Sequence, residues 1–261
     1  MKLRTALLAT ALAVGIAFPV VAEELKFANF TPPFHTINAS VIEKLNEKDS
    51  SSISFFSNVL VFEDTLIEEH ITGIPGDEFF DEFLPKCNNM EKAQIAKEFV
   101  KFNERCMIRL LGDMRSYNYV IIPTHDFDQV IYKIRAIDFD QQCYEGNLKV
   151  YRPQFFKENK FIMNLIKERL DSNSVDQYKT EERSIIAKRI LSSESRTKKI
   201  IECMSQDKIS TDENILLLSK QVYKLTRDKN FINSKNMGEI IRASFNYVLR
   251  NYENREMLSV N

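Results

Sequence analysis

Residues 90–140 contain a change of hydrophobic period that constrains the fold more than any other feature of the sequence. Over residues 90–110 an apolar side chain recurs every three or four positions, which is typical of an amphipathic helix. Two short apolar runs come next, YVIIP at 119–123 and VIYKIRAI at 130–137. The polar sequence THDFDQ between them predicts a turn, so we expect the two runs to form a β-hairpin.

The rest of the chain is mainly helical in pattern, which makes α+β the expected fold class. Residues 53–71 hold two β-type runs, separated by Glu63 and Asp64, and residues 77–86 read as a short helix. We therefore expect a mostly helical protein with a small, incomplete sheet on its N-terminal side. Beyond the hairpin, the predicted helices cover residues 158–170, 175–193, 195–205, 211–228 and 236–252.

Charge and cysteine content exclude several classes of function. The chain has 36 Lys and Arg against 37 Asp and Glu, a net charge of −1, so no basic excess points to nucleic acid as a partner. The four cysteines are widely spaced, with no C-x-x-C pair and no histidine at ligand spacing. We expect them to be reduced thiols, and we expect no structural zinc.

Residues 1–22 have the layout of a secretory signal peptide. Lys2 and Arg4 precede an apolar run of about 17 residues, and Ala22 ends a small-residue cleavage site. An uncleaved membrane anchor is the alternative, but the run is shorter than the ~20 residues that span a bilayer. We expect cleavage after Ala22, export to the periplasm or medium, and no stable membrane span afterwards.

Residues 23–46 differ in character from the remainder of the chain. They begin ELKFANF, a short strand pattern, continue with Pro32-Pro33, and end in an amphipathic helix start. Together with the leader, this segment resembles the N-terminus of the periplasmic solute receptors of TRAP transporters. The resemblance implies a binding protein for an organic acid, although nothing later in the sequence continues it. The polar sequence EKDSSS at 47–52 reads as a linker, so we divide the chain into 1–22, 23–52 and 53–261.

The candidate catalytic and metal-binding residues lie within residues 111–140. Asp113 comes after a predicted helix, Asn118 comes five residues later, and Asp138 comes after the second strand of the hairpin. In order and spacing this segment resembles the catalytic core of the protein-kinase-like superfamily, which includes protein kinases and aminoglycoside phosphotransferases. Their catalytic loop is D-x-x-x-x-N and their metal-binding motif is D-F-G or a variant. The resemblance covers about residues 55–250 and implies a kinase-like C-terminal lobe.

This resemblance implies specific roles. Asp113 would be the catalytic base or hydroxyl-positioning group, and Asn118 and Asp138 would be ligands of Mg²⁺. Arg115 would contact the transferred phosphate. The carboxylate and amide oxygens are suited to Mg²⁺, because that ion prefers oxygen ligands.

The resemblance also implies a nucleotide site upstream of the loop. A kinase hinge presents backbone N–H and C=O groups to the adenine edge, and we place it near Glu69, His70 and Ile71. The implied cofactors are ATP and Mg²⁺. The implied partners are this nucleotide and a hydroxyl acceptor whose identity the sequence does not give.

Several departures from the family pattern predict weak activity or none. Leu111 stands where the family usually has His, and Asp140 replaces the Gly of D-F-G. No Gly-rich loop occurs before residue 61, and no V-A-x-K strand is found. In the alternative interpretation, Asp113 and Asp138 only cap turns and the motif spacing is a coincidence.

Two functions from different classes therefore remain as hypotheses. The first is a kinase-like phosphotransferase that moves the γ-phosphate of ATP to a hydroxyl, or a degenerate form of one. The second is a truncated TRAP-type receptor for an organic acid. The two hypotheses imply different cellular locations, since ATP is found in the cytoplasm and the leader implies export. Because of the leader, we expect the protein to be exported. A join near residues 47–52 between two unrelated segments would reconcile them.

Overall fold

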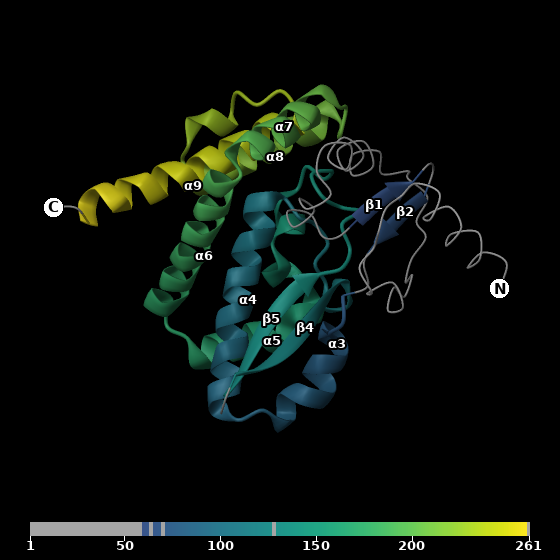
Figure 1. Ribbon diagram of the computed structural model, residues 1–261, viewed down its shortest axis with the longest axis vertical. Coiled ribbons are helices and arrows are strands. Elements are labelled where there is room, and N and C mark those ends of the chain that lie inside the picture. Colours follow the sequence, from purple (N-terminus) through teal and green to yellow (C-terminus); the bar gives the residue numbers. More distant parts are fainter. Residues whose placement is uncertain (1–58, 63–64, 69–70, 127–128, 260–261) are drawn as a thin grey trace, which may run out of the picture.

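The computed structural model describes residues 59–62, 65–68, 71–126 and 129–259 (Figure 1). The described part is mostly helical, with two small antiparallel sheets, so the expected α+β class is confirmed. The first sheet pairs β1 with β2, and the second has the order β3-β4-β5. The strands are β1 (Val59–Phe62), β2 (Thr65–Glu68), β3 (Ile74–Pro75), β4 (Tyr119–Asp126) and β5 (Gln129–Ala136).

The helices of the described part lie close to the predicted ranges. The exception is residues 77–86, which pass from the short helix α3 (Gly76–Glu78) through a π turn (Phe79–Phe83) into a 3₁₀ turn (Leu84–Lys86). Pro85 cannot donate a backbone hydrogen bond, so a regular α-helix cannot continue through it. The α-helices are α3 (Gly76–Glu78), α4 (Asn89–Arg109), α5 (Lys160–Arg169), α6 (Ser172–Ser192), α7 (Glu194–Gln206), α8 (Asp212–Thr226) and α9 (Met237–Ser259).

Some sequence-based expectations fall on residues without a structural description. The leader, the receptor-like segment and the linker of residues 1–52 lie outside the described residues, and so do Glu69 and His70. Within the described ranges, no helix combines the length and apolar character that crossing a bilayer requires. All four cysteines are free thiols, and burial raises the pKa of Cys106 to about 12.

The sheet β3-β4-β5 lies against α4. Along β5, Tyr132 and Ile134 are buried while Lys133 and Arg135 are exposed, the alternation expected of a strand covered on one face. The β4–β5 pairing runs from Tyr119 opposite Ala136 to Asp126 opposite Gln129. This register matters for the site, because it brings the residue before β4 next to the residue after β5.

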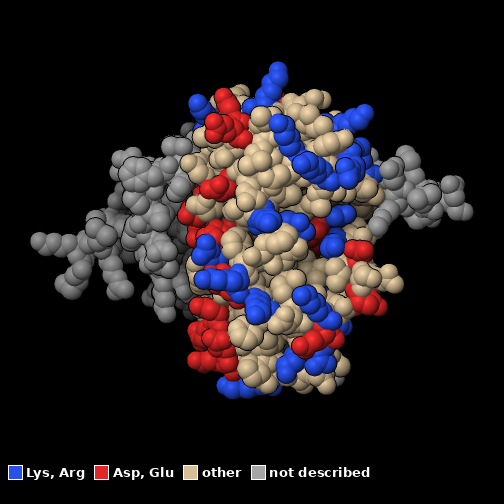
Figure 2. All heavy atoms as spheres, turned by 180° about the vertical axis from the view of Figure 1, so that it is seen from behind, with Lys and Arg blue, Asp and Glu red and all other residues tan. Residues whose placement is uncertain are grey.

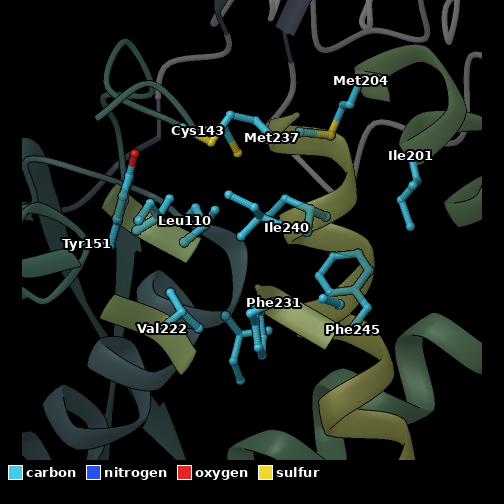
Figure 3. Packing of buried hydrophobic residues seen from close by; sticks show 14 of the residues in the cluster. Leu110, Cys143, Tyr151, Ile201, Met204, Val222, Phe231, Met237, Ile240 and Phe245 are labelled. Atoms are coloured by element: carbon cyan, nitrogen blue, oxygen red, sulfur yellow. The ribbon is translucent and has the colours of Figure 1, made fainter. Parts of the chain in front are cut away.

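Helix α4 is shared by two hydrophobic clusters. Most of its buried side chains, from Ile95 to Cys106, pack with α5 and the sheet. Its last turn belongs instead to the cluster of the C-terminal helices, through Ile108 and Leu110. Figure 3 shows Leu110 among side chains of α9, including Ile240. A loop that leaves the end of α4 is therefore anchored between both clusters.

The two ends of α4 are closed by specific hydrogen bonds. At the N-terminus Asn88 and Glu91 form a capping box, in which each side chain accepts a backbone N–H of the other residue. At the C-terminus Leu110 adopts a left-handed conformation with φ 49°. The Ser244 hydroxyl of α9 donates to the Ile108 carbonyl (2.9 Å), and the Cys143 amide donates to the Leu110 carbonyl (2.9 Å). These bonds use carbonyls that the end of a helix leaves without a partner.

Candidate functional site

The loop after α4 has an unusual backbone at Asp113. Its φ is 53°, a left-handed conformation that few residues other than glycine adopt, although Asp does so more readily than most. Gly112 precedes it, and a Cβ at that position would lie 2.6 Å from the Gln141 carbonyl oxygen. The Asp113 amide donates to the Val150 carbonyl at 3.1 Å. The loop is thus held between residues 141 and 150, which both come after the hairpin.

The Asn118 side chain explains why Asp113 and Asn118 stand five residues apart. Its Nδ2 donates to the backbone carbonyl of Asp113 at 2.7 Å and so closes the loop from the inside. Two backbone bonds tighten the same turn, from the Arg115 amide to Asp113 and from the Asn118 amide to Arg115. Asn118 is buried, and no described residue donates to its Oδ1. That oxygen is the part of the side chain left for a ligand.

Asp138 joins this group through the hairpin register. The Asn118 carbonyl accepts the Ile137 amide at 3.1 Å, directly before Asp138. The pKa of Asp138 is raised, first by burial and then by the neighbouring carboxyl of Asp140 and the charge of Asp113, while a backbone bond from Asp140 acts in the opposite direction. The Asp138 side chain itself accepts the Asp140 amide at 3.2 Å. The backbone therefore brings Asp138 close in the fold to Asn118, which is bonded to Asp113, but no hydrogen bond or ion pair among the described residues joins the Asp138 side chain to either of them.

Arg115 pairs with Asp113. Its Nε donates to Asp113 Oδ1 at 2.8 Å, and this bond is the main reason that the Arg115 pKa is raised. Its Nη1 donates to the Tyr117 hydroxyl at 3.2 Å and lies 3.7 Å from Glu158 Oε1. The guanidinium also lies over the Phe156 ring, 5.5 Å from its centroid. Arg115 thus orients the Asp113 carboxylate, while its 38% exposed side chain remains open to an anion.

Asn159 links the loop to two neighbouring segments, and the sequence does not predict this role. This side chain is fully buried and joins three separate segments. Its Nδ2 donates to the carbonyls of Met114 (2.9 Å) and Pro153 (2.8 Å), and its Oδ1 accepts the Tyr119 hydroxyl at 2.7 Å. An Asn at the start of a helix is ordinarily interpreted as a cap, yet its side chain caps nothing in α5. No local pattern distinguishes the two cases.

We expect Tyr119→Phe to lower the free energy of unfolding by about 1–3 kcal/mol, because Asn159 Oδ1 would then be buried without a donor. Urea denaturation measures the change. Tyr117→Phe is the matched control, since the Tyr117 side chain is 47% exposed and water can replace its contact with Arg115. Its effect should stay within about 0.5 kcal/mol. Equal losses in the two variants would contradict the bridging role of Asn159.

The predicted nucleotide hinge is described only in part. Ile71 is half-buried and lies in the segment that leads into β3, whereas Glu69 and His70 lie outside the described residues. The adenine-binding function of these three residues therefore stays a prediction. Upstream, β1 and β2 pair antiparallel, where the sequence shows its two β-type runs.

The residues gathered here partly fit a magnesium ion bound together with a nucleotide. Among the residues that the structure describes, no three His, Cys, Asp or Glu side chains converge as a metal cage would require. Mg²⁺ at nucleotide sites, however, is held by one or two carboxylates together with phosphate oxygens. Asp138 and the Oδ1 of Asn118 would supply one carboxylate oxygen and one amide oxygen to such a site. The site would bind the metal with its phosphates rather than alone.

A separate hollow in the structure has no comparable chemistry. It lies between the end of α4 and the helices α8 and α9, and includes Met107, Val222 and Phe231 in its lining. These side chains are apolar, and none of the lining residues belongs to the Asp113 loop. We therefore take the loop, with its charged and amide groups, as the candidate site.

Comparison with known proteins gives no relative for this chain. No protein-family model, no curated protein sequence and no solved structure matches it.

Proposed function

We propose that this chain is a kinase-like phosphotransferase, or a degenerate form of one, with its site at Asp113, Asn118 and Asp138. The observation that carries the proposal is the closure of the loop. The Asn118 amide bonds the Asp113 backbone, and the hairpin returns the chain so that Asp138 comes directly after the residue bonded to Asn118. The Asp138 side chain also accepts the Asp140 amide at 3.2 Å, as a turn-capping Asp does, so the proposal rests on the closure of the loop and on the hairpin register rather than on this bond.

In this proposal each side chain has a distinct task. Asp113 accepts a hydrogen bond from the acceptor hydroxyl and orients its oxygen, and Arg115 keeps the carboxylate in place. Asn118 Oδ1 and Asp138 would hold Mg²⁺. When bound, the ion would neutralise charge on the phosphate oxygens. The exposed part of the Arg115 guanidinium would attract the transferred phosphate.

We expect the activity to be weak. The sequence lacks a Gly-rich loop before residue 61, so the phosphates would have no backbone N–H cradle from that source. It also lacks the strand lysine that fixes a positive charge beside them. Catalysis of phosphoryl transfer rests on positioning and electrostatic stabilisation, so these losses cost several orders of magnitude in rate.

Calorimetric titration of the full chain with ATP, with Mg²⁺ and with EDTA, tests the proposal at the level of binding. We expect a Kd on the order of 0.1–1 mM with Mg²⁺ and no measurable binding with EDTA, because Asp138 repels bare phosphate. A parallel titration with a C4 dicarboxylate tests the receptor hypothesis. Binding of the dicarboxylate without binding of ATP would overturn the phosphotransferase proposal.

A further inference from the structure

One exposed face of α8 combines cations with leucines. Lys220, Lys224 and Arg227 occur at spacings of four and three residues, so they lie on the same side of the helix, and all three are exposed. Leu216 and Leu217 lie on this side one turn earlier and are 54% and 46% exposed. The opposite side of α8 carries the buried residues Ile215, Leu218, Ser219 and Val222.

The charge of this region differs in sign from that of the chain. Residues 212–235, counted from the start of α8, contain five Lys and Arg and three Asp and Glu, a local excess of two positive charges in a chain whose net charge is −1. Of the three carboxylates, Asp228 is paired with Arg250 of α9, and Glu213 lies one turn before Leu216 and Leu217 on the same side of α8. Figure 2 shows Lys and Arg side chains at the end of the molecule that α7, α8 and α9 form, together with a smaller group of Asp and Glu side chains. Cations are therefore in moderate excess in this region.

Arg227 occupies a position that favours glycine. It ends α8 in the left-handed conformation, with φ 60°, and its amide donates to the Tyr223 carbonyl at 2.7 Å. Helices commonly place Gly here, since a Cβ is unfavourable in this conformation. Arginine at this position adds a positive charge to this side of α8, but its left-handed conformation lowers the stability of the fold.

We propose that this face of α8 binds the surface of an anionic lipid bilayer. Cations attract acidic headgroups, and leucines on the same face can enter the boundary between headgroups and acyl chains. A nucleic acid or a uniformly charged acidic polypeptide would pair with the cations but leave Leu216 and Leu217 in water. The leucines are therefore the observation that favours a bilayer over those partners, and the proposal does not depend on phosphotransfer.

Vesicle binding of the full chain tests this proposal. With phosphatidylcholine vesicles that contain roughly one third phosphatidylserine, we expect binding that weakens as salt rises from about 50 to about 200 mM. The triple variant Lys220→Gln/Lys224→Gln/Arg227→Gln should lower the partition coefficient about 100-fold, since each cation near such a surface contributes about fivefold. The double variant Leu216→Ser/Leu217→Ser should lower it about tenfold with the salt dependence unchanged.

The control removes the same charge elsewhere. Lys157, Lys160 and Lys167 are exposed in or directly before α5, at the other end of the molecule from α8 (Figure 1), and changing all three to Gln should alter binding less than about threefold. Residues 1–22 are the same in every variant, so differences between variants report the substituted helices. Absence of binding to phosphatidylserine vesicles, an equal loss in the control, or tighter binding to polyglutamate or RNA than to vesicles would overturn the proposal.

Arg227→Gly separates binding from folding. It should raise the Tm by about 2 °C, because the left-handed position is relieved, and at the same time weaken vesicle binding about fivefold. A rise in Tm with unchanged vesicle binding would remove Arg227 from the proposed face.

Discussion

Replacing Arg105 by methionine is expected to lower the free energy of unfolding by about 3–5 kcal/mol. The Arg105 guanidinium lies between three elements: it donates to Glu98 of α4 (2.6 Å), to Glu182 of α6 (3.2 Å) and to the Ile134 carbonyl of β5 (3.1 Å). The Glu182 side chain is only 3% exposed. Methionine would fill a similar volume but leave this carboxylate buried without its cation.

The pKa of Arg105 supports this expectation. Burial acts to lower it, but the charges of Glu98 and Glu182 outweigh burial, and the pKa is raised. The charged form of Arg105 is therefore more stable in the folded protein than in the unfolded chain, so the pair of carboxylates compensates its desolvation.

Urea denaturation with a two-state fit measures the change. Lys198→Met is the matched control, because its pair with Glu194 is exposed on both sides and an exposed pair contributes little to stability. Arg105→Met/Glu182→Leu should recover part of the loss, since that variant no longer buries the Glu182 carboxylate alone. A loss below about 1 kcal/mol in Arg105→Met would show that the carboxylates are hydrated and that the network does not join the three elements.

Replacing Asp138 by asparagine is expected to lower the affinity for ATP with Mg²⁺ at least tenfold and to abolish residual phosphoryl transfer. The substitution keeps an oxygen that can accept the Asp140 amide, now 3.2 Å from Asp138 Oδ1, but removes the charge that would hold the metal. Loss of a direct ligand is expected to cost at least as much as loss of a group that only orients ligands, for which effects of roughly 10–100-fold are typical.

Folding should not suffer in this variant. The raised pKa of Asp138 means that the folded protein disfavours its ionised form, mainly through burial. This cost to stability is present above the folded-state pKa and is relieved as the pH falls through it. Asparagine carries no charge, so at neutral pH the variant should be as stable as the parent or more so.

Calorimetry and a phosphoryl-transfer assay with labelled ATP measure the two effects, and thermal unfolding checks the fold. Arg115→Gln is the comparison at the same site, because it removes one contact to phosphate but no metal ligand; its transfer rate should fall less. If transfer survives in Asp138→Asn, the chemistry lies elsewhere in the chain, and the proposed role of Asp138 is wrong.

Local periodicity predicts much of the fold. The stripe over 90–110 corresponds to α4, and the two apolar runs after it correspond to β4 and β5, because one buried face is enough to set each period. Strand β3 has only two residues, too few to show alternation, and the sequence does not predict it. It pairs with Val120 and Ile121, so it exists through tertiary contact rather than through its own sequence.

The candidate site is predictable where its members are close in sequence. Asp113 and Asn118 share one loop, and their spacing carries the hydrogen bond that closes it. Asn159 and Glu182 escape prediction, because each acts on residues about 40 to 80 positions away. A polar residue in a helical segment has no pattern that distinguishes such a bridge from an ordinary surface position.

The hydrogen bond between Ser244 and Ile108 has a consequence for synthesis of the chain. It joins residues 136 positions apart and belongs to the cluster that closes the end of α4. At ribosomal rates of about 5–20 residues per second, roughly 7–27 s separate the emergence of these two residues. During that interval the apolar side chains at the end of α4 that α9 later covers are exposed and can bind other proteins. We therefore expect nascent chains that stop before α9 to be held by chaperones or degraded.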